Sequence, residues 1–187
     1  MNNKLNTRAV ILSALLCSIG IIIPMFSPIK IILEPASFTL ASHVPIFIAM
    51  FISPGTALFV AFGTTLGFLL GGFPITVVLR ALSHVVFVSI GSFYLKKNKE
   101  VIKNMKSSML YSFFIALIHA ISEVLIVIPF YLGSSLSAGY YDKGFIVSIL
   151  GLVGVGTLIH SMLDFTLSVY IWNLLPKEVV KKSMIKA

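Results

Sequence analysis

Apolar runs of helix length recur along nearly the whole sequence, and this pattern constrains the fold more than any other feature. Only 11% of the residues are charged, whereas soluble domains average about 25%. Crossing the ~30 Å hydrocarbon core of a bilayer takes about 20 apolar residues, so a chain of 187 residues holds about six or seven spans. We therefore predict an all-α integral membrane protein, with residues 1–187 forming a single transmembrane domain.

Six spans are favoured over seven because the chain is short. The predicted spans cover about residues 8–24, 38–52, 56–70, 75–95, 109–132 and 156–175. The proline-rich residues 25–37 and the residues 133–155 are predicted to form outer capping loops. The final apolar run, 144–175, is longer than one span at 1.5 Å per residue. Its glycines between 151 and 156 are therefore predicted to break it and leave 144–155 as a re-entrant or capping segment.

The first apolar run follows two basic residues, which is also how a signal peptide begins. No small-residue cleavage site follows it, so a retained helix is predicted. Ala9, Ser13 and Cys17 recur on it at four-residue spacing, which allows close helix–helix approach. That strip either packs within this protein or docks onto another membrane subunit. Gly63 and Gly67 have the same spacing and predict packing. Since Cys17 is the single cysteine, it excludes an intramolecular disulfide and a two-cysteine zinc site.

Basic residues lie mostly near the chain ends and in residues 96–106. With six spans, these segments all fall on one side of the membrane. The positive-inside rule makes that side cytoplasmic, so both termini are predicted to be cytoplasmic and the protein to lie in the plasma membrane. The cytoplasmic leaflet also accounts for the net charge of +8, so no nucleic acid is expected as a partner.

The stretch from Thr76 to Val88 is apolar except for Arg80, Ser83 and His84, and Arg80 and His84 stand four residues apart on one face of the predicted helix. An arginine near the bilayer centre costs at least ~2.5 kcal/mol, so it is rarely accidental. Two further pairs have the same spacing, and they are His119 with Glu123 and His160 with Asp164. The predicted topology places these pairs and His43 in the outer half of the membrane or near its middle. Such one-sidedness is typical of a pocket that receives a small solute from outside.

Structural roles compete with ligand binding for these residues. Arg80 could brace Glu123 or Asp164, His43 could hydrogen-bond between helices, and His119 could orient Glu123. Histidine–carboxylate pairs also fit an intramembrane metalloenzyme, although no HExxH run is present. The sequence has no glycine-rich phosphate loop, so it is not expected to hydrolyse ATP itself.

Residues 34–45, 72–84 and 157–164 resemble the niacin-type S-components, the substrate-binding subunits of energy-coupling-factor (ECF) vitamin transporters. These stretches read EPASFTLASHVP, GFPITVVLRALSH and TLIHSMLD, and the likeness covers most of the chain. The resemblance implies a non-enzymatic subunit that binds no cofactor or metal of its own. It also implies a transmembrane T-subunit and two cytoplasmic ATPases as partners, with ATP used by those ATPases.

The resemblance further implies docking to the T-subunit through the first helix, here Ala9, Ser13 and Cys17. It implies a substrate site near the outer face and a toppling motion that carries the pocket to the cytoplasmic side. The expected substrate is nicotinate, with another small vitamin as the alternative. The candidate substrate-binding residues are Arg80, His84, Glu123, His119, His160, Asp164, His43, Glu34, Tyr140 and Tyr141. Of these, Arg80 is expected to pair with the carboxylate.

Overall fold

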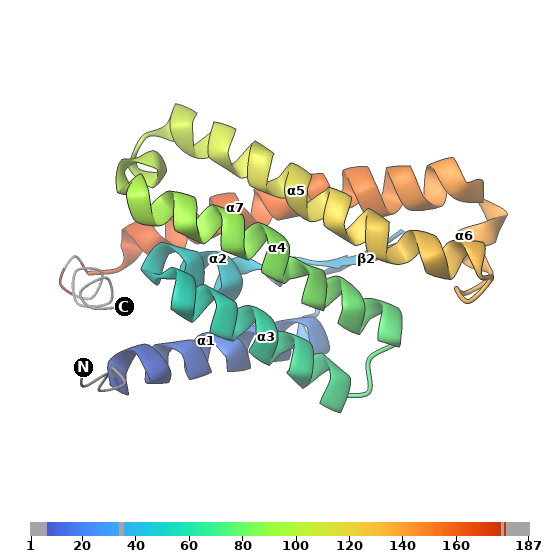
Figure 1. Cartoon of the computed structure of the whole chain (residues 1–187), viewed down its shortest axis with the longest axis horizontal. Coiled ribbons are helices and arrows are strands. Elements are labelled where there is room, and N and C mark those ends of the chain that lie inside the picture. The colour runs from blue at the N-terminus through green and yellow to red at the C-terminus, as the bar shows by residue number, and fades with distance from the viewer. Residues whose placement is uncertain (1–6, 34–35, 177, 179–187) are drawn as a thin grey trace.

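Long apolar helices dominate the computed structural model, which describes residues 7–33, 36–176 and 178 (Figure 1). The main helices are α1 (Thr7–Phe26), α2 (Val44–Ile52), α3 (Pro54–Leu70), α4 (Ile75–Lys97), α5 (Met105–Leu132) and α7 (Gly156–Leu174). The shorter elements are β1 (Lys30–Leu33), β2 (Ala36–Thr39), the 3₁₀-helix η1 (Lys99–Lys103), α6 (Gly139–Asp142) and the π-helix η2 (Ile146–Val155).

Among the described residues, four helical stretches are long and apolar enough to cross a membrane. They are Thr7–Phe26, Ile75–Lys97, Met105–Leu132 and Ile146–Leu174. The helix Pro54–Leu70 is apolar but shorter. Many large apolar side chains on these helices point outward, among them Leu15, Phe93 and Leu125. Lipid tails solvate such side chains and water does not, so the fold is that of a membrane protein.

Helix α2 lies at the centre of the bundle and contacts α1, α3, α4 and α7. Its sequence VPIFIAMFI is apolar all round, which is typical of a fully buried helix. Phe47 and Met50 are almost completely buried there. Around it, α3 packs against both α1 and α4, and α5 packs against both α4 and α7. This arrangement brings α4, α5 and α7 together around the start of α2.

Side-chain caps define two of the helix starts. Ser53 Oγ accepts a hydrogen bond of 3.1 Å from the amide of Thr56, with Pro54 at the first helical position of α3. Asn104 Oδ1 accepts one of 2.9 Å from the amide of Lys106 at the start of α5. These caps separate α2 from α3 and η1 from α5.

The start of α1, the end of α7 and the α4–α5 connection lie at one end of the bundle, and α6 lies at the other (Figure 1). Arg8 and the lysines of residues 96–106 therefore gather at one end, as the predicted topology requires. That this end faces the cytoplasm stays a prediction.

The predicted second span, 38–52, differs from the structure in its first half. Residues 36–39 form strand β2, which pairs antiparallel with β1 so that Ile31 faces Phe38. Residues 40–43 form a turn, and helix α2 has only nine residues. At 1.5 Å per residue it is about 14 Å long and cannot cross a bilayer alone. The proline-rich loop before it is therefore in large part a β-hairpin.

The predicted break in the final apolar run is wrong. The π-helix η2 continues directly into α7, and Gly156 at the junction has helical angles of φ −59° and ψ −47°. The helical stretch Ile146–Leu174 has 29 residues. Gly156 instead gives room for a neighbour, because a Cβ there would lie 2.5 Å from Phe38 Cζ of β2. Glycine thus lets the hairpin pack closely on this helix.

The small-residue strip of α1 faces the inside of the protein. Ser13 is buried, and its hydroxyl donates to the carbonyl of Ala9 at 2.7 Å. A Cβ on Gly63 of α3 would lie 2.5 Å from Cys17 Sγ, and one on Gly67 would overlap Ile21. The predicted packing role of Gly63 and Gly67 is confirmed. Cys17 of the strip packs against Gly63 of α3 in the same chain, while docking of Ala9, Ser13 and Cys17 onto a partner stays a prediction.

Candidate functional site

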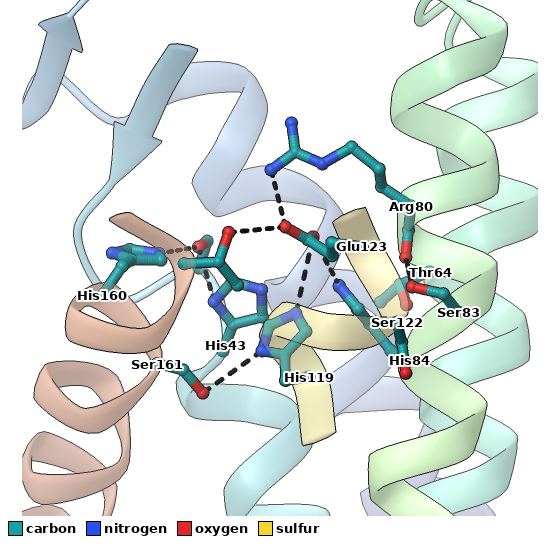
Figure 2. A network of polar contacts seen from close by, with 12 residues as sticks. His43, Thr64, Arg80, Ser83, His84, His119, Ser122, Glu123, His160 and Ser161 are labelled. Atoms are coloured by element: carbon teal, nitrogen blue, oxygen red, sulfur yellow. Dashed lines mark hydrogen bonds and ion pairs between the residues drawn. The ribbon is translucent and has the colours of Figure 1, made fainter. Parts of the chain in front are cut away.

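All four histidines of the chain meet inside the bundle, although each comes from a different element (Figure 2). The ring of His43, in the turn before α2, lies among the other three. Its centroid is 5.0 Å from that of His84 on α4, 4.8 Å from His119 on α5 and 5.0 Å from His160 on α7. The predicted convergence of the residue pairs on α4, α5 and α7 is therefore observed.

Glu123 links three helices through one of its oxygens. Arg80 Nη2 donates to Glu123 Oε2 at 2.8 Å, and Thr157 Oγ1 donates to the same oxygen at 2.6 Å. Glu123 is nearly buried, with 4% of its side chain exposed, while 18% of the Arg80 side chain is exposed. The buried Nε atom of Arg80 has no hydrogen-bond partner. The guanidinium thus braces α4 against α5 and keeps donor capacity for another group.

The second oxygen of Glu123 faces two histidine nitrogens at longer distances. Glu123 Oε1 lies 3.5 Å from His84 Nε2 and 3.4 Å from His119 Nε2. Both ring nitrogens are buried, and neither has a hydrogen-bond partner. Buried polar atoms are rarely left in that state. These two nitrogens and Glu123 Oε1 therefore form a polar spot whose hydrogen bonding is incomplete.

Asp164 holds the turn before α2 in place. Its Oδ1 accepts from the amide of Ala41 at 2.8 Å, and its Oδ2 accepts from the amide of His43 at 2.8 Å. His43 Nδ1 lies 3.2 Å from the same Oδ2. Ala41 has a φ of 67°, which is unfavourable for a residue with a Cβ. The completely buried carboxylate therefore stabilises a strained turn and fixes the position of His43.

A cavity of about 270 Å³ opens beside this cluster. Arg80, His84, Glu123, His43 and His160 line it on the polar side, and Phe38, Phe68 and Phe73 line it on the apolar side. The rings of Phe68 and Phe73 stack with centroids 4.7 Å apart. Ligand pockets usually measure about 300–1,000 Å³, so this cavity lies at the small end of that range and suits a ligand of one small ring.

The other predicted site residues lie outside the cavity lining. His119 and Asp164 are completely buried behind it and contact lining residues. Tyr141 donates to the carbonyl of Phe130 and accepts from the amide of Leu136, and Tyr140 packs in an apolar cluster near η2. Glu34 lies outside the described residues.

Three hydroxyl groups of the site were missed by sequence reasoning. Ser42 Oγ lies 3.0 Å from His160 Nε2, and Ser161 Oγ lies 3.2 Å from His119 Nδ1. The third is Thr157, which binds Glu123. Thr157, Ser161 and Asp164 follow the helical spacing of one face, so the same four-residue spacing indicates Thr157 and Ser161, whereas no local pattern indicates Ser42.

Among the residues that the structure describes, two groups of side chains have the geometry to hold a metal ion. One consists of His43, His84 and His119, and the other of His43, His160 and Asp164. Within each group, one potential ligand atom per residue lies within 4.8 Å of the others.

Comparison with known proteins gives a clear relative. No family model matches the chain, and no solved structure matches it significantly. The chain is 41% identical over 174 residues to the niacin transporter NiaX of Lactococcus lactis subsp. cremoris. The aligned part covers 93% of this chain and 77% of NiaX.

Proposed function

The chain belongs to the same family as the niacin transporter NiaX, and on this basis we propose that it is the substrate-binding S-component of an ECF-type transporter for niacin. It captures nicotinate from outside the cell and delivers it with a T-subunit and two cytoplasmic ATPases. Both termini face the cytoplasm, and the membrane is the plasma membrane. The protein acts in transport, so the alternative of an intramembrane metalloenzyme is not retained.

The observation that carries this proposal is the position of Arg80 in the wall of a small, partly aromatic cavity. Nicotinate is one pyridine ring with one carboxylate. The carboxylate binds the guanidinium nitrogens that Glu123 does not use, one of which points away from Glu123 in Figure 2. Charge-assisted hydrogen bonds of this kind are about twice as strong as neutral ones. The ring lies against Phe68 and Phe73, whose stacked faces suit an aromatic ligand.

Calorimetry with nicotinate and its neutral amide tests the role of Arg80. We expect the purified protein to bind nicotinate at least tenfold more tightly than nicotinamide, because the amide has no charge to pair with Arg80. Arg80→Gln abolishes most of this preference. Arg80→Lys keeps part of it, since lysine has the charge but lacks the planar guanidinium that binds a carboxylate through two hydrogen bonds. Lys97→Gln at the far end of α4 is the matched control. Equal affinity for both ligands, or an unchanged Arg80→Gln variant, contradicts the proposal. A panel of other small vitamins tests the alternative substrates.

The partner subunits supply the energy, because this sequence has no phosphate-binding loop of its own. Ser13 of the docking strip predicted from the sequence is buried, so we propose that the neighbouring small residues Ala14 and Ser18 form the docking surface. Both are exposed on α1, where they permit close approach of a partner helix. The pocket reaches the cytoplasmic side by toppling of the whole subunit.

A further inference from the structure

We propose that His43, His84 and His119 bind a divalent transition-metal ion of the zinc type beside the cavity. One ring nitrogen from each lies within 4.8 Å of the others. A tetrahedral zinc site with Zn–N bonds of 2.0–2.1 Å places its nitrogens roughly 3.4 Å apart. Small side-chain rotations bring the three nitrogens, which lie within 4.8 Å of one another, to this separation. His43 and His84 line the cavity, so a fourth coordination position faces the cavity and accepts water or a ligand.

The rings of His43 and His119 each make a hydrogen bond through Nδ1, which leaves Nε2 of each ring available for a metal ion. Asp164 binds His43 at Nδ1 at 3.2 Å, and Ser161 contacts His119 at Nδ1 at 3.2 Å. Metal-binding histidines typically use one nitrogen for the ion and the other for a carboxylate or similar acceptor. The buried Nε2 atoms of His84 and His119 have no hydrogen-bond partner. This is the pattern expected of ligands whose outer partners are already in place.

The charges of the cluster also favour a cation. Glu123 and Asp164 are both buried, while Arg80 is the cationic side chain that pairs with Glu123. With neutral histidines, the cluster carries one excess negative charge inside the membrane, which is costly. A divalent ion next to Glu123 Oε1, which lies 3.4–3.5 Å from His119 and His84, changes the net charge of the cluster from −1 to +1 and lies beside a carboxylate oxygen that attracts it. A proton on one histidine would compensate the same charge, and zinc binding distinguishes the two cases.

The second group, His43 with His160 and Asp164, is less suited to an ion. Both oxygens of Asp164 already accept backbone amides at 2.8 Å. The Nε2 atom of His160 lies 3.0 Å from Ser42 Oγ. A metal there would have to displace these hydrogen bonds and release the turn at Ala41. The imidazole ligands of the first group are also those that zinc, copper and nickel prefer.

Zinc titration of the purified protein tests this proposal without any vitamin, so a negative result leaves the niacin assignment intact. The protein is prepared without a polyhistidine tag, stripped with a chelator and titrated with Zn²⁺ by calorimetry. Cobalt(II) absorption reports the coordination geometry. We expect one zinc per chain and a tetrahedral cobalt spectrum. Less than stoichiometric zinc in the wild-type protein overturns the proposal, and this result does not depend on the folding of any variant.

Variants assign the ion to its ligands. Ser161→Ala removes only an outer hydrogen bond and lowers zinc affinity about tenfold to a hundredfold. His84→Gln and His119→Gln lower it at least as much. His160→Gln retains zinc binding because it belongs to the second group. If zinc is lost in His160→Gln and kept in His84→Gln and His119→Gln, the ion lies in the second group and the proposal is wrong.

Discussion

Arg80 on α4 and Glu123 on α5 form an ion pair of 2.8 Å between two helices that pack side by side. The structural brace and the ligand-binding role considered for Arg80 are therefore compatible. One terminal nitrogen holds Glu123, and Arg80 also lines the cavity. Fixing the cation before a ligand arrives lowers the entropic cost of binding.

Glu123→Ala is expected to destabilise the protein strongly. It leaves Arg80 as a largely buried charge without a partner, which typically costs about 3–5 kcal/mol. Thermal unfolding in detergent measures this loss. Glu100→Ala is the matched control, because Glu100 pairs with Lys103 at 2.7 Å on the exposed surface. Exposed pairs contribute at most about 1 kcal/mol. Equal shifts in the two variants would show that Glu123 is not a brace.

Asp164→Asn tests the role of the carboxylate in the turn before α2. Both oxygens accept backbone amides, so the amide group of asparagine must place its NH₂ opposite a backbone donor. We expect a loss of about 1–3 kcal/mol in stability and weaker nicotinate binding, because His43 loses its support. Unfolding and calorimetry measure the two effects. Asp142→Asn, at an exposed position of α6, should change neither.

Ala41→Gly is expected to stabilise the protein by up to about 1 kcal/mol. Ala41 has a φ of 67°, where a Cβ is unfavourable and glycine is not. Ala138→Gly is the control and is expected to destabilise the protein. Ala138 has a φ of −50°, so glycine relieves no strain there and only increases the entropy of the unfolded chain. Paired unfolding curves of the two variants should shift in opposite directions. A destabilised Ala41→Gly variant would mean that the turn is not strained.

Gly67→Ala tests the close packing of α3 on α1. A Cβ at Gly67 overlaps the side chain of Ile21, and such overpacking costs about 1–3 kcal/mol. Gly55→Ala on the same helix meets no atom closer than Ser53 Oγ at 4.0 Å. Alanine is the better helix former, so that control should be neutral or slightly stabilising. The pair is compared by thermal unfolding, and a neutral Gly67→Ala contradicts close packing.

Docking through the exposed face of α1 predicts a separation of function. Large side chains in the double variant Ala14→Phe, Ser18→Phe should prevent co-purification with the T-subunit while nicotinate binding by the isolated subunit is unchanged. Val86→Phe adds the same bulk to an exposed position of α4 and should leave the complex intact. A complex that forms normally with the double variant would place the docking surface elsewhere.

The residue pairs on single helices were predictable because helical geometry alone decides them. Residues four apart share a face, so Arg80 with His84, or His160 with Asp164, had to point in similar directions. The tight packing at Gly63 and Gly67 was also readable from spacing. In contrast, the spacing of the strip that includes Ser13 allowed packing within the protein or docking onto another subunit, and only the tertiary structure showed that Cys17 packs against Gly63 of α3.

The hairpin and the short helix α2 were not predicted, because a continuous apolar run looks the same whether it forms a strand or a buried helix. The bond from Asp164 to the amide of Ala41 joins residues far apart in the chain, and no local pattern reports it. The glycine at 156 was misread for a similar reason. Its neighbour Phe38 belongs to a strand more than a hundred residues away, and local sequence treats every glycine as a possible break.

The sequence by itself determined the membrane-embedded helical class, the family and the residues able to do chemistry, because hydropathy and helical spacing are local properties. Only the tertiary structure decided that His43 lies among the histidines of α4, α5 and α7, with a cavity on one side and Asp164 on the other. The physical reason is that a site made from four elements depends on how they pack. Packing is set by long-range contacts such as the Arg80–Glu123 pair, which no single segment contains.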